Sequence, residues 1–130
     1  YRELDTERGP FMLPTTTPVQ FDPDALHATI DRMMSYRPQR VLQTHFGPVT
    51  DLERLARDLH ASIVELVRIA RQHADAADRC ARIETDMFRY FSVRLDEHGY
   101  PGDLARRHEL LDDDVRLNAA GLEAWLNRRG

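Results

Sequence analysis

Six histidines are the residues of this sequence best suited to bind a metal ion or to move a proton near neutral pH. His45 has the most suggestive surroundings, because it follows the apolar pair Val41-Leu42 and precedes the turn signal Gly47-Pro48. We expect it at the C-terminal end of a short buried strand, on a turn. A metal site needs several convergent ligands, so spacing alone makes His45 a packed or hydrogen-bonded turn residue.

The other histidines do not form a recognisable ligand set. His60 and His73 lie thirteen residues apart on one predicted helix, a rise of about 20 Å, and cannot share an ion. His98 and His108 flank a turn and could approach each other, but nothing fixes a third ligand. The run 112–114 consists of three aspartates without the spacing or the mid-loop glycine of a calcium loop, and it is typical of a solvated helix N-terminus.

Covalent catalysis finds little support in the sequence. The serines lack a Gly-x-Ser-x-Gly elbow, and they fall in predicted helices or at their ends. Cys80 is predicted on an apolar helix face, where a thiol is usually inert packing. As the only cysteine it excludes an internal disulfide, which fits a reducing cytoplasm.

The elements that would position these groups are mostly helices. Asp22-Pro23 is a helix start, and the helix is predicted to reach Tyr36, with His27 at the edge of its apolar face. Thr50 is the predicted N-cap of a strongly amphipathic helix that runs to His73. Three further helical segments are predicted at about 76–97, after Asp103 and over 112–129; Gly99 ends the first of them, and Gly121 either allows close packing or marks a break.

The N-terminal fifth is predicted to be mostly extended or irregular. Residues 1–9 are polar and read as irregular, and 11–13 as an edge strand. The stretch from Thr15 to Phe21 is extended because of Pro18, and either a structural crossover or a substrate-lining loop fits it, with the crossover favoured.

The composition argues against nucleic acid as a partner and against a membrane-spanning segment. The 130 residues carry a formal net charge of −4, and their basic residues are all arginines without a basic stripe, which disfavours nucleic-acid binding. No apolar run approaches the ~20 residues of a membrane helix.

Several short motifs together resemble the C-terminal portion of a metallo-β-lactamase-fold hydrolase. They are the run 14–23 (PTTTPVQFDP), Ile30-Asp31-Arg32 on the next helix, Arg37-Pro38 and Thr44-His45-Phe46-Gly47. The segment 117–122 with Trp125-Leu126 is similar to the helical tail of a bacterial branch of that superfamily. The resemblance implies that His45 is a ligand of zinc or another divalent metal.

The same resemblance implies that this chain is incomplete. The family's His-x-His-x-Asp-His motif is absent, as are its second histidine and its bridging aspartate. We therefore expect a fragment that begins downstream of those ligands and needs the upstream metal-binding part of the same protein. Residues 1–50 would be the edge of the metallo-β-lactamase-like domain, and 51–130 a helical C-terminal subdomain.

The expected fold is mainly α, with a short strand/helix/strand piece of an αββα sandwich followed by a bundle of three to four amphipathic helices. The expected function is that of a C-terminal fragment of a cytoplasmic metal-dependent hydrolase, inactive alone and associated as a homodimer. The alternative is a helical dimerisation or interaction module without catalysis, in which the apolar stripe from Leu52 to Ala70 serves self-association.

Overall fold

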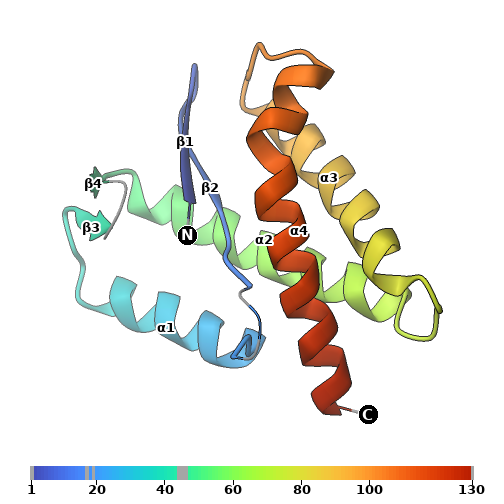
Figure 1. Ribbon diagram of the computed structural model, residues 1–130. Coiled ribbons are helices and arrows are strands. Elements are labelled where there is room, and N and C mark those ends of the chain that lie inside the picture. The colour runs from blue at the N-terminus through green and yellow to red at the C-terminus, as the bar shows by residue number, and fades with distance from the viewer. Residues whose placement is uncertain (1, 17, 19, 44–46, 130) are drawn as a thin grey trace.

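The computed structural model describes residues 2–16, 18, 20–43 and 47–129, and the protein is mainly helical (Figure 1). This part of the chain forms two short hairpins, each followed by a helix, and then two further helices. In order they are β1 (Arg2–Thr6), β2 (Gly9–Leu13), α1 (Pro23–Ser35), β3 (Val41–Gln43), β4 (Gly47–Val49), α2 (Leu52–Gln72), α3 (Arg79–Glu97) and α4 (Leu104–Arg129). Each sheet of the described residues has two antiparallel strands. The mainly helical class is confirmed, whereas an αββα sandwich is not present among these residues.

The first hairpin corrects the prediction that residues 1–9 are irregular. Strand β1 pairs with β2 so that Arg2 lies opposite Leu13 and Thr6 opposite Gly9. Gly9 has φ +94°, a conformation that glycine adopts without steric cost. The polar sequence of β1 gives little strand signal by itself. Its backbone is ordered by pairing with β2, whose Phe11, Met12 and Leu13 are buried in the core.

Helix α1 begins where the sequence predicts. The carboxylate of Asp22 accepts a hydrogen bond from the Ala25 amide at 3.0 Å, and Pro23 occupies the first helical position. The helix ends at Ser35 with Tyr36 as its C-cap.

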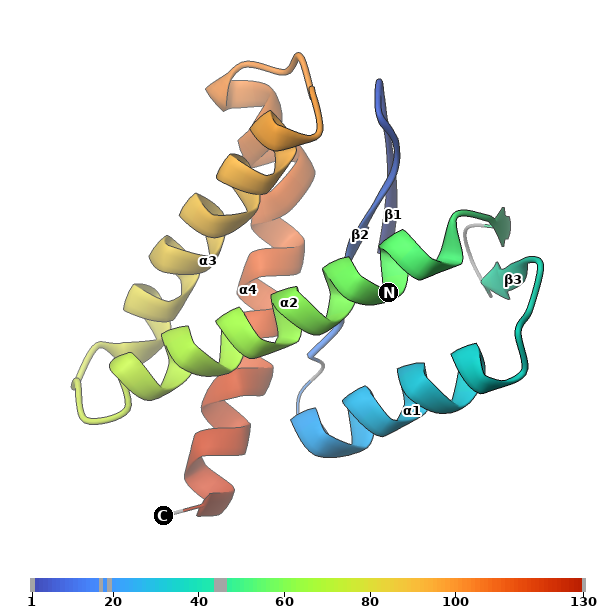
Figure 2. The same cartoon turned by 180° about the vertical axis from the view of Figure 1, so that it is seen from behind.

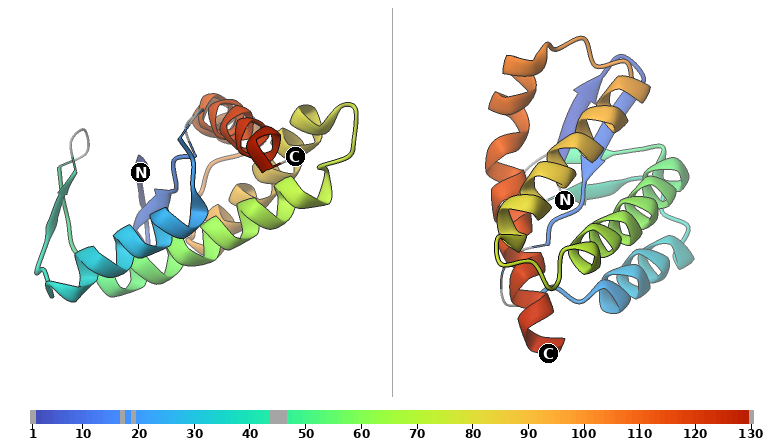
Figure 3. Two further views of the ribbon diagram at one scale, coloured as in Figure 1. Left: turned by 90° about the horizontal axis from the view of Figure 1, so that it is seen from below. Right: turned by 90° about the vertical axis from the view of Figure 1, so that its right-hand side faces the viewer.

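The second hairpin differs from the predicted buried strand. Strand β3 pairs with β4, Val41 opposite Val49, and the hairpin projects from one end of the α1 and α2 pair (Figure 3). Leu42 is 71% exposed and Val41 is half-buried, so the prediction of a buried strand is wrong. Among the described residues only β4 pairs with β3, and nothing covers the outer face where Leu42 lies.

Helix α2 confirms the strongest helix prediction and lies at the centre of the molecule (Figure 2). Its apolar stripe is buried against α1, β2, α3 and α4. The buried members are Leu55, Leu59, Ile63, Leu66, Ile69 and Ala70. The predicted N-cap is wrong: Asp51, not Thr50, precedes the helix, in a left-handed conformation with φ +56°. Its carboxylate bonds to Arg54 and makes no capping bond to the backbone.

Helix α3 ends at Glu97, and Gly99 terminates it as predicted. The Tyr100 amide bonds to the Leu95 carbonyl and the Gly99 amide to that of Asp96, both at 2.9 Å, and Gly99 has φ +73°. This is the Schellman pattern, which favours glycine at the left-handed position. The helix begins at Arg79, three residues later than predicted.

The last 26 helical residues form one helix, α4, where two segments are predicted. No glycine or proline interrupts the chain between Leu104 and Ala120. The aspartates taken for a second N-terminus lie mid-helix, where Asp112 pairs with His108 at 2.8 Å and Asp113 with Arg116 at 2.9 Å. Gly121 is buried and does not break the helix.

The segment between the first hairpin and α1 is fastened to α4. Thr16 is fully buried, and its amide donates to Asn118 Oδ1 at 2.7 Å while its hydroxyl donates to the Asn118 carbonyl at 2.8 Å. Asn118 Nδ2 in turn donates to the Pro14 carbonyl at 3.1 Å. These contacts favour a structural crossover over a substrate-lining loop at Thr16.

One apolar core joins the elements on both sides of residue 50. It includes Phe11 and Ile30 before that point and Ile63, Phe91 and Leu122 after it. No helix in the described part of the chain is both long enough and apolar enough to cross a bilayer.

Candidate functional site

His45, the predicted metal ligand, lies outside the described residues, and its metal role stays a prediction. In sequence it falls between the end of β3 and the start of β4. Within the described ranges, no group of three or more histidine, cysteine, aspartate or glutamate side chains is placed to hold a metal ion. A site with three protein ligands would therefore need ligands from outside the described residues.

The other predicted histidines have separate partners. His73 bonds to Asp86 on α3 at 2.7 Å. His108 lies against the Phe88 ring with centroids 4.2 Å apart, and it also bonds to Asp112. His98 is buried beside Phe11, and no hydrogen bond or ring contact joins it to His108 in the described part of the chain.

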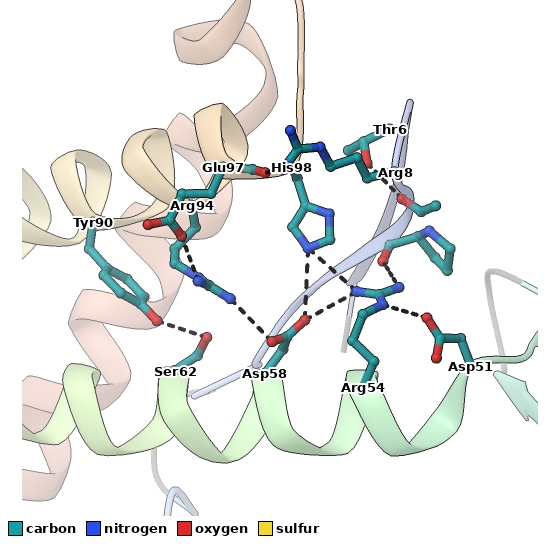
Figure 4. A network of polar contacts seen from close by, with 12 residues as sticks. Thr6, Arg8, Asp51, Arg54, Asp58, Ser62, Tyr90, Arg94, Glu97 and His98 are labelled. Carbon is teal, nitrogen blue, oxygen red and sulfur yellow. Dashed lines mark hydrogen bonds and ion pairs between the residues drawn. The ribbon is translucent and has the colours of Figure 1, made fainter.

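A network of polar contacts joins α2 and α3, and we call it the Asp58 network; it is formed by Asp58, Arg54, Arg94 and His98 (Figure 4). Arg54 donates to Asp58 Oδ2 at 3.1 Å, and Arg94 donates to Asp58 Oδ1 at 3.2 Å. His98 Nε2 lies 3.8 Å from Asp58 Oδ2 and 3.4 Å from Arg54 Nη1. One carboxylate on α2 is thereby shared by two arginines, of which Arg94 lies on α3.

Arg54 extends this network to the first hairpin and to the residue before α2. Its guanidinium donates to the Pro10 carbonyl in β2 at 2.9 Å and to the Asp51 carboxylate at 2.5 Å. Asp51 lies two residues after β4, so the second bond fixes the start of α2. On the other side, Arg8 in the turn of the first hairpin donates to the Glu97 carbonyl at 2.6 Å. These bonds hold the first hairpin to α2 and α3.

His98 is the buried imidazole of the network. Burial and the positive charge of Arg54 lower its pKa, although Asp58 acts in the opposite direction. Arg54 can only donate, so His98 Nε2 accepts and the proton of the neutral ring lies on Nδ1. Nδ1 is buried without a hydrogen-bond partner among the described residues. The residue is only 8% exposed, which suits a positioning role better than proton transfer to a substrate.

Cys80 is unsuited to nucleophilic catalysis. Burial, together with the nearby carboxylates of Glu123 and Glu84, raises the pKa of its thiol to about 11. The thiolate is the nucleophile, and it is scarce at neutral pH in such surroundings. The structure thus supports the inert thiol predicted from the sequence.

Compared with known protein families, curated proteins and solved structures, the chain shows no significant match. The resemblance to the metallo-β-lactamase superfamily therefore rests on the short motifs quoted above.

Proposed function

We propose that this chain works as the C-terminal part of a metal-dependent hydrolase of the metallo-β-lactamase superfamily. In this proposal His45 supplies one metal ligand, and α2, α3 and α4 form a helical tail. The remaining ligands belong to the upstream part of the same protein, so the chain alone is inactive.

The observation that carries the proposal is the exposed second hairpin. Strand β3 is three residues long and leaves Leu42 71% exposed, next to the predicted ligand position. A strand that presents a large apolar side chain on its outer face is suited to packing against a further layer of the protein. A hairpin at the edge of a larger sheet would have such a layer, which is the place that the resemblance implies for residues 1–50.

The Asp58 network supports the proposal by giving the helical tail a role. Metal ligands work only when the elements that carry them are held rigidly. Arg54 bonds on one side to Asp51, just after β4, and on the other to Pro10 in β2. The tail would thus position the His45 turn relative to the first hairpin.

A bound metal would lower the pKa of a coordinated water and supply hydroxide at neutral pH. No group of three or more potential metal ligands gathers among the described residues. In this proposal their part is to position the strands that precede and follow His45 in the sequence. The proposal therefore assigns no catalytic residue among them.

The alternative, an interaction module, has less support. The apolar stripe of α2 that was expected to drive self-association is buried within the chain. Val64, on α2 outside that stripe, is 60% exposed, but a single valine makes no interface. The homodimer itself stays a prediction, and light scattering over a wide concentration range tests it.

The test is to express the protein with the sequence encoded upstream of Tyr1 and to measure bound zinc, iron and manganese. We expect about one or two ions per chain, a loss of metal in His45→Ala, and hydrolysis of thioesters or phosphodiesters that falls with it. His108→Ala is the matched control, since this exposed histidine lies on α4.

Two results would overturn the proposal. One is a start codon close to Tyr1, with no His-x-His-x-Asp-His motif before it. The other is a metal content that His45→Ala leaves unchanged.

A further inference from the structure

Two histidines from different helices approach each other through their Nδ1 atoms. His27 on α1 and His60 on α2, 33 residues apart in sequence, place their Nδ1 atoms 2.5 Å from each other. The ring planes differ by 12° and the centroids are 4.8 Å apart. The distance between the centroids is close to the sum of the Nδ1–Nδ1 distance and the radii of the two rings, so the centroids and the two Nδ1 atoms lie nearly on one line. The two imidazoles therefore lie nearly in one plane, edge to edge, and not face to face.

A carboxylate fixes the tautomer of one of these rings. His60 Nε2 lies 3.1 Å from Asp31 Oδ1 on α1. An ionised carboxylate only accepts, so His60 carries a proton on Nε2, and its Nδ1 presents a lone pair when the ring is neutral. That lone pair points at His27 Nδ1. A proton on His27 Nδ1 can bridge the two nitrogens as a hydrogen bond, and a metal ion bound by both nitrogens can take the place of that proton.

The geometry points to a metal site: we propose that His27 and His60 together bind one divalent transition-metal ion through their Nδ1 atoms. An imidazole whose other nitrogen donates to a carboxylate is the usual arrangement of a metal-bound histidine, and Asp31 supplies that carboxylate to His60. The proposed site is separate from His45 and does not depend on the proposed hydrolase function.

Loading requires a small movement. Zinc–nitrogen distances of about 2.0–2.1 Å in a tetrahedral site place two nitrogens roughly 3.3 Å apart. The two Nδ1 atoms must therefore separate by a little under ~1 Å, which side-chain rotation provides. The His60 side chain is 29% exposed and His27 is half-buried, so the rings have room to turn outward. No third protein ligand gathers there within the described ranges, and water completes the coordination.

The donor set selects the class of ion. Neutral imidazole suits zinc, copper and nickel, whereas magnesium and calcium prefer carboxylate and carbonyl oxygens. For a site of this kind affinity rises toward copper along the divalent series. Because the ion bridges α1 and α2, it would stabilise the folded chain over the unfolded one.

The experiment is a zinc and copper titration by calorimetry on the 130-residue chain carrying His45→Ala, so that an ion at His45 is not counted. We expect one ion per chain, a higher melting temperature on loading, and at least a tenfold loss of affinity in His27→Ala and in His60→Ala. Asp31→Asn should weaken binding by ~10-fold or more, because it removes the carboxylate behind His60. His108→Ala, at an exposed position on α4, should bind like the parent.

Electron paramagnetic resonance of the copper-loaded chain gives a readout that does not depend on stability. The signal should show coupling to two imidazole nitrogens in the parent and to one in either single variant that retains copper. Unchanged affinity in both single variants would overturn the site, as would an equal loss in His108→Ala. Magnesium binding as tight as that of zinc would overturn the choice of ion.

Discussion

Replacement of Asn118 on α4 by alanine should lower the free energy of unfolding of the chain strongly. Its side chain is buried, accepts from the Thr16 amide at 2.7 Å and donates to the Pro14 carbonyl at 3.1 Å. In Asn118→Ala both backbone groups stay buried, but each loses this partner. The Thr16 hydroxyl keeps its bond to the carbonyl of residue 118, because the backbone is unchanged.

The magnitude follows from those two groups. A buried polar group left without its hydrogen bond costs about 1–3 kcal/mol, and the pair therefore about 3–5 kcal/mol once the small cavity is included. Domains of this size unfold with about 5–15 kcal/mol. At a mid-range stability of about 10 kcal/mol, the variant should lose roughly a third to a half of its stability and still fold, with a lower melting temperature.

Urea unfolding followed by circular dichroism at 222 nm measures the change. With a slope of about 1.5 kcal/mol per molar urea, the midpoint should fall by roughly 2–3 M. Asn127→Ala is the matched control, because this asparagine lies on the same helix, is exposed, and accepts a side-chain hydrogen bond from Arg79 at the surface. It should cost less than about 0.5 kcal/mol. An equal cost for the two variants would refute the reasoning.

Three other predictions concern the helices and the Asp58 network. Arg54→Met should cost about 1–3 kcal/mol and speed amide exchange in β2, whereas Arg57→Met, at an exposed position, should change stability little. The pKa of His98 is lowered in the fold, so the contribution of this residue to the free energy of unfolding is complete above about pH 6.5 and is lost as the pH falls through the folded pKa. His98→Gln should flatten that decline in the urea midpoints, and His108→Gln should not. With its pKa raised to about 11 from 9.0, Cys80 should react with iodoacetamide at pH 8 about 100-fold more slowly than an ordinary thiol, and a normal rate would contradict this.

Local signals in the sequence predicted the helices well. Asp22-Pro23 and Gly99 mark boundaries through caps that form within a few residues, and these positions are confirmed. The apolar stripe of α2 is confirmed because its period fits one helix face packed on a core.

Features that depend on distant partners could not be predicted in this way. Strand β1 has no apolar alternation and is ordered by pairing with β2. Asp51 precedes α2 without capping it, because Arg54 occupies its carboxylate. Three aspartates within α4 resemble a helix start, but neighbouring basic side chains pair with two of them.

The candidate sites divide in the same way. His45 follows from strand and turn signals and from family resemblance, and its role remains to be tested. The contact of His27 with His60 joins two helices, whereas periodicity placed His27 near the edge of its apolar face and His60 beside Leu59. Bringing the two together requires knowing that α1 and α2 pack against each other, which local sequence signals do not give.

The bonds from Thr16 to Asn118 span 102 residues, and this separation bears on synthesis at the ribosome. The segment that leaves the ribosome early cannot reach its native partners until α4 has been made. Until then the apolar faces of α2 and α3 that pack against α4 lack this cover, and chains in this state are prone to associate. A stalled or truncated chain that ends before α4 should therefore depend on chaperones, even though its hairpin and first helices are complete.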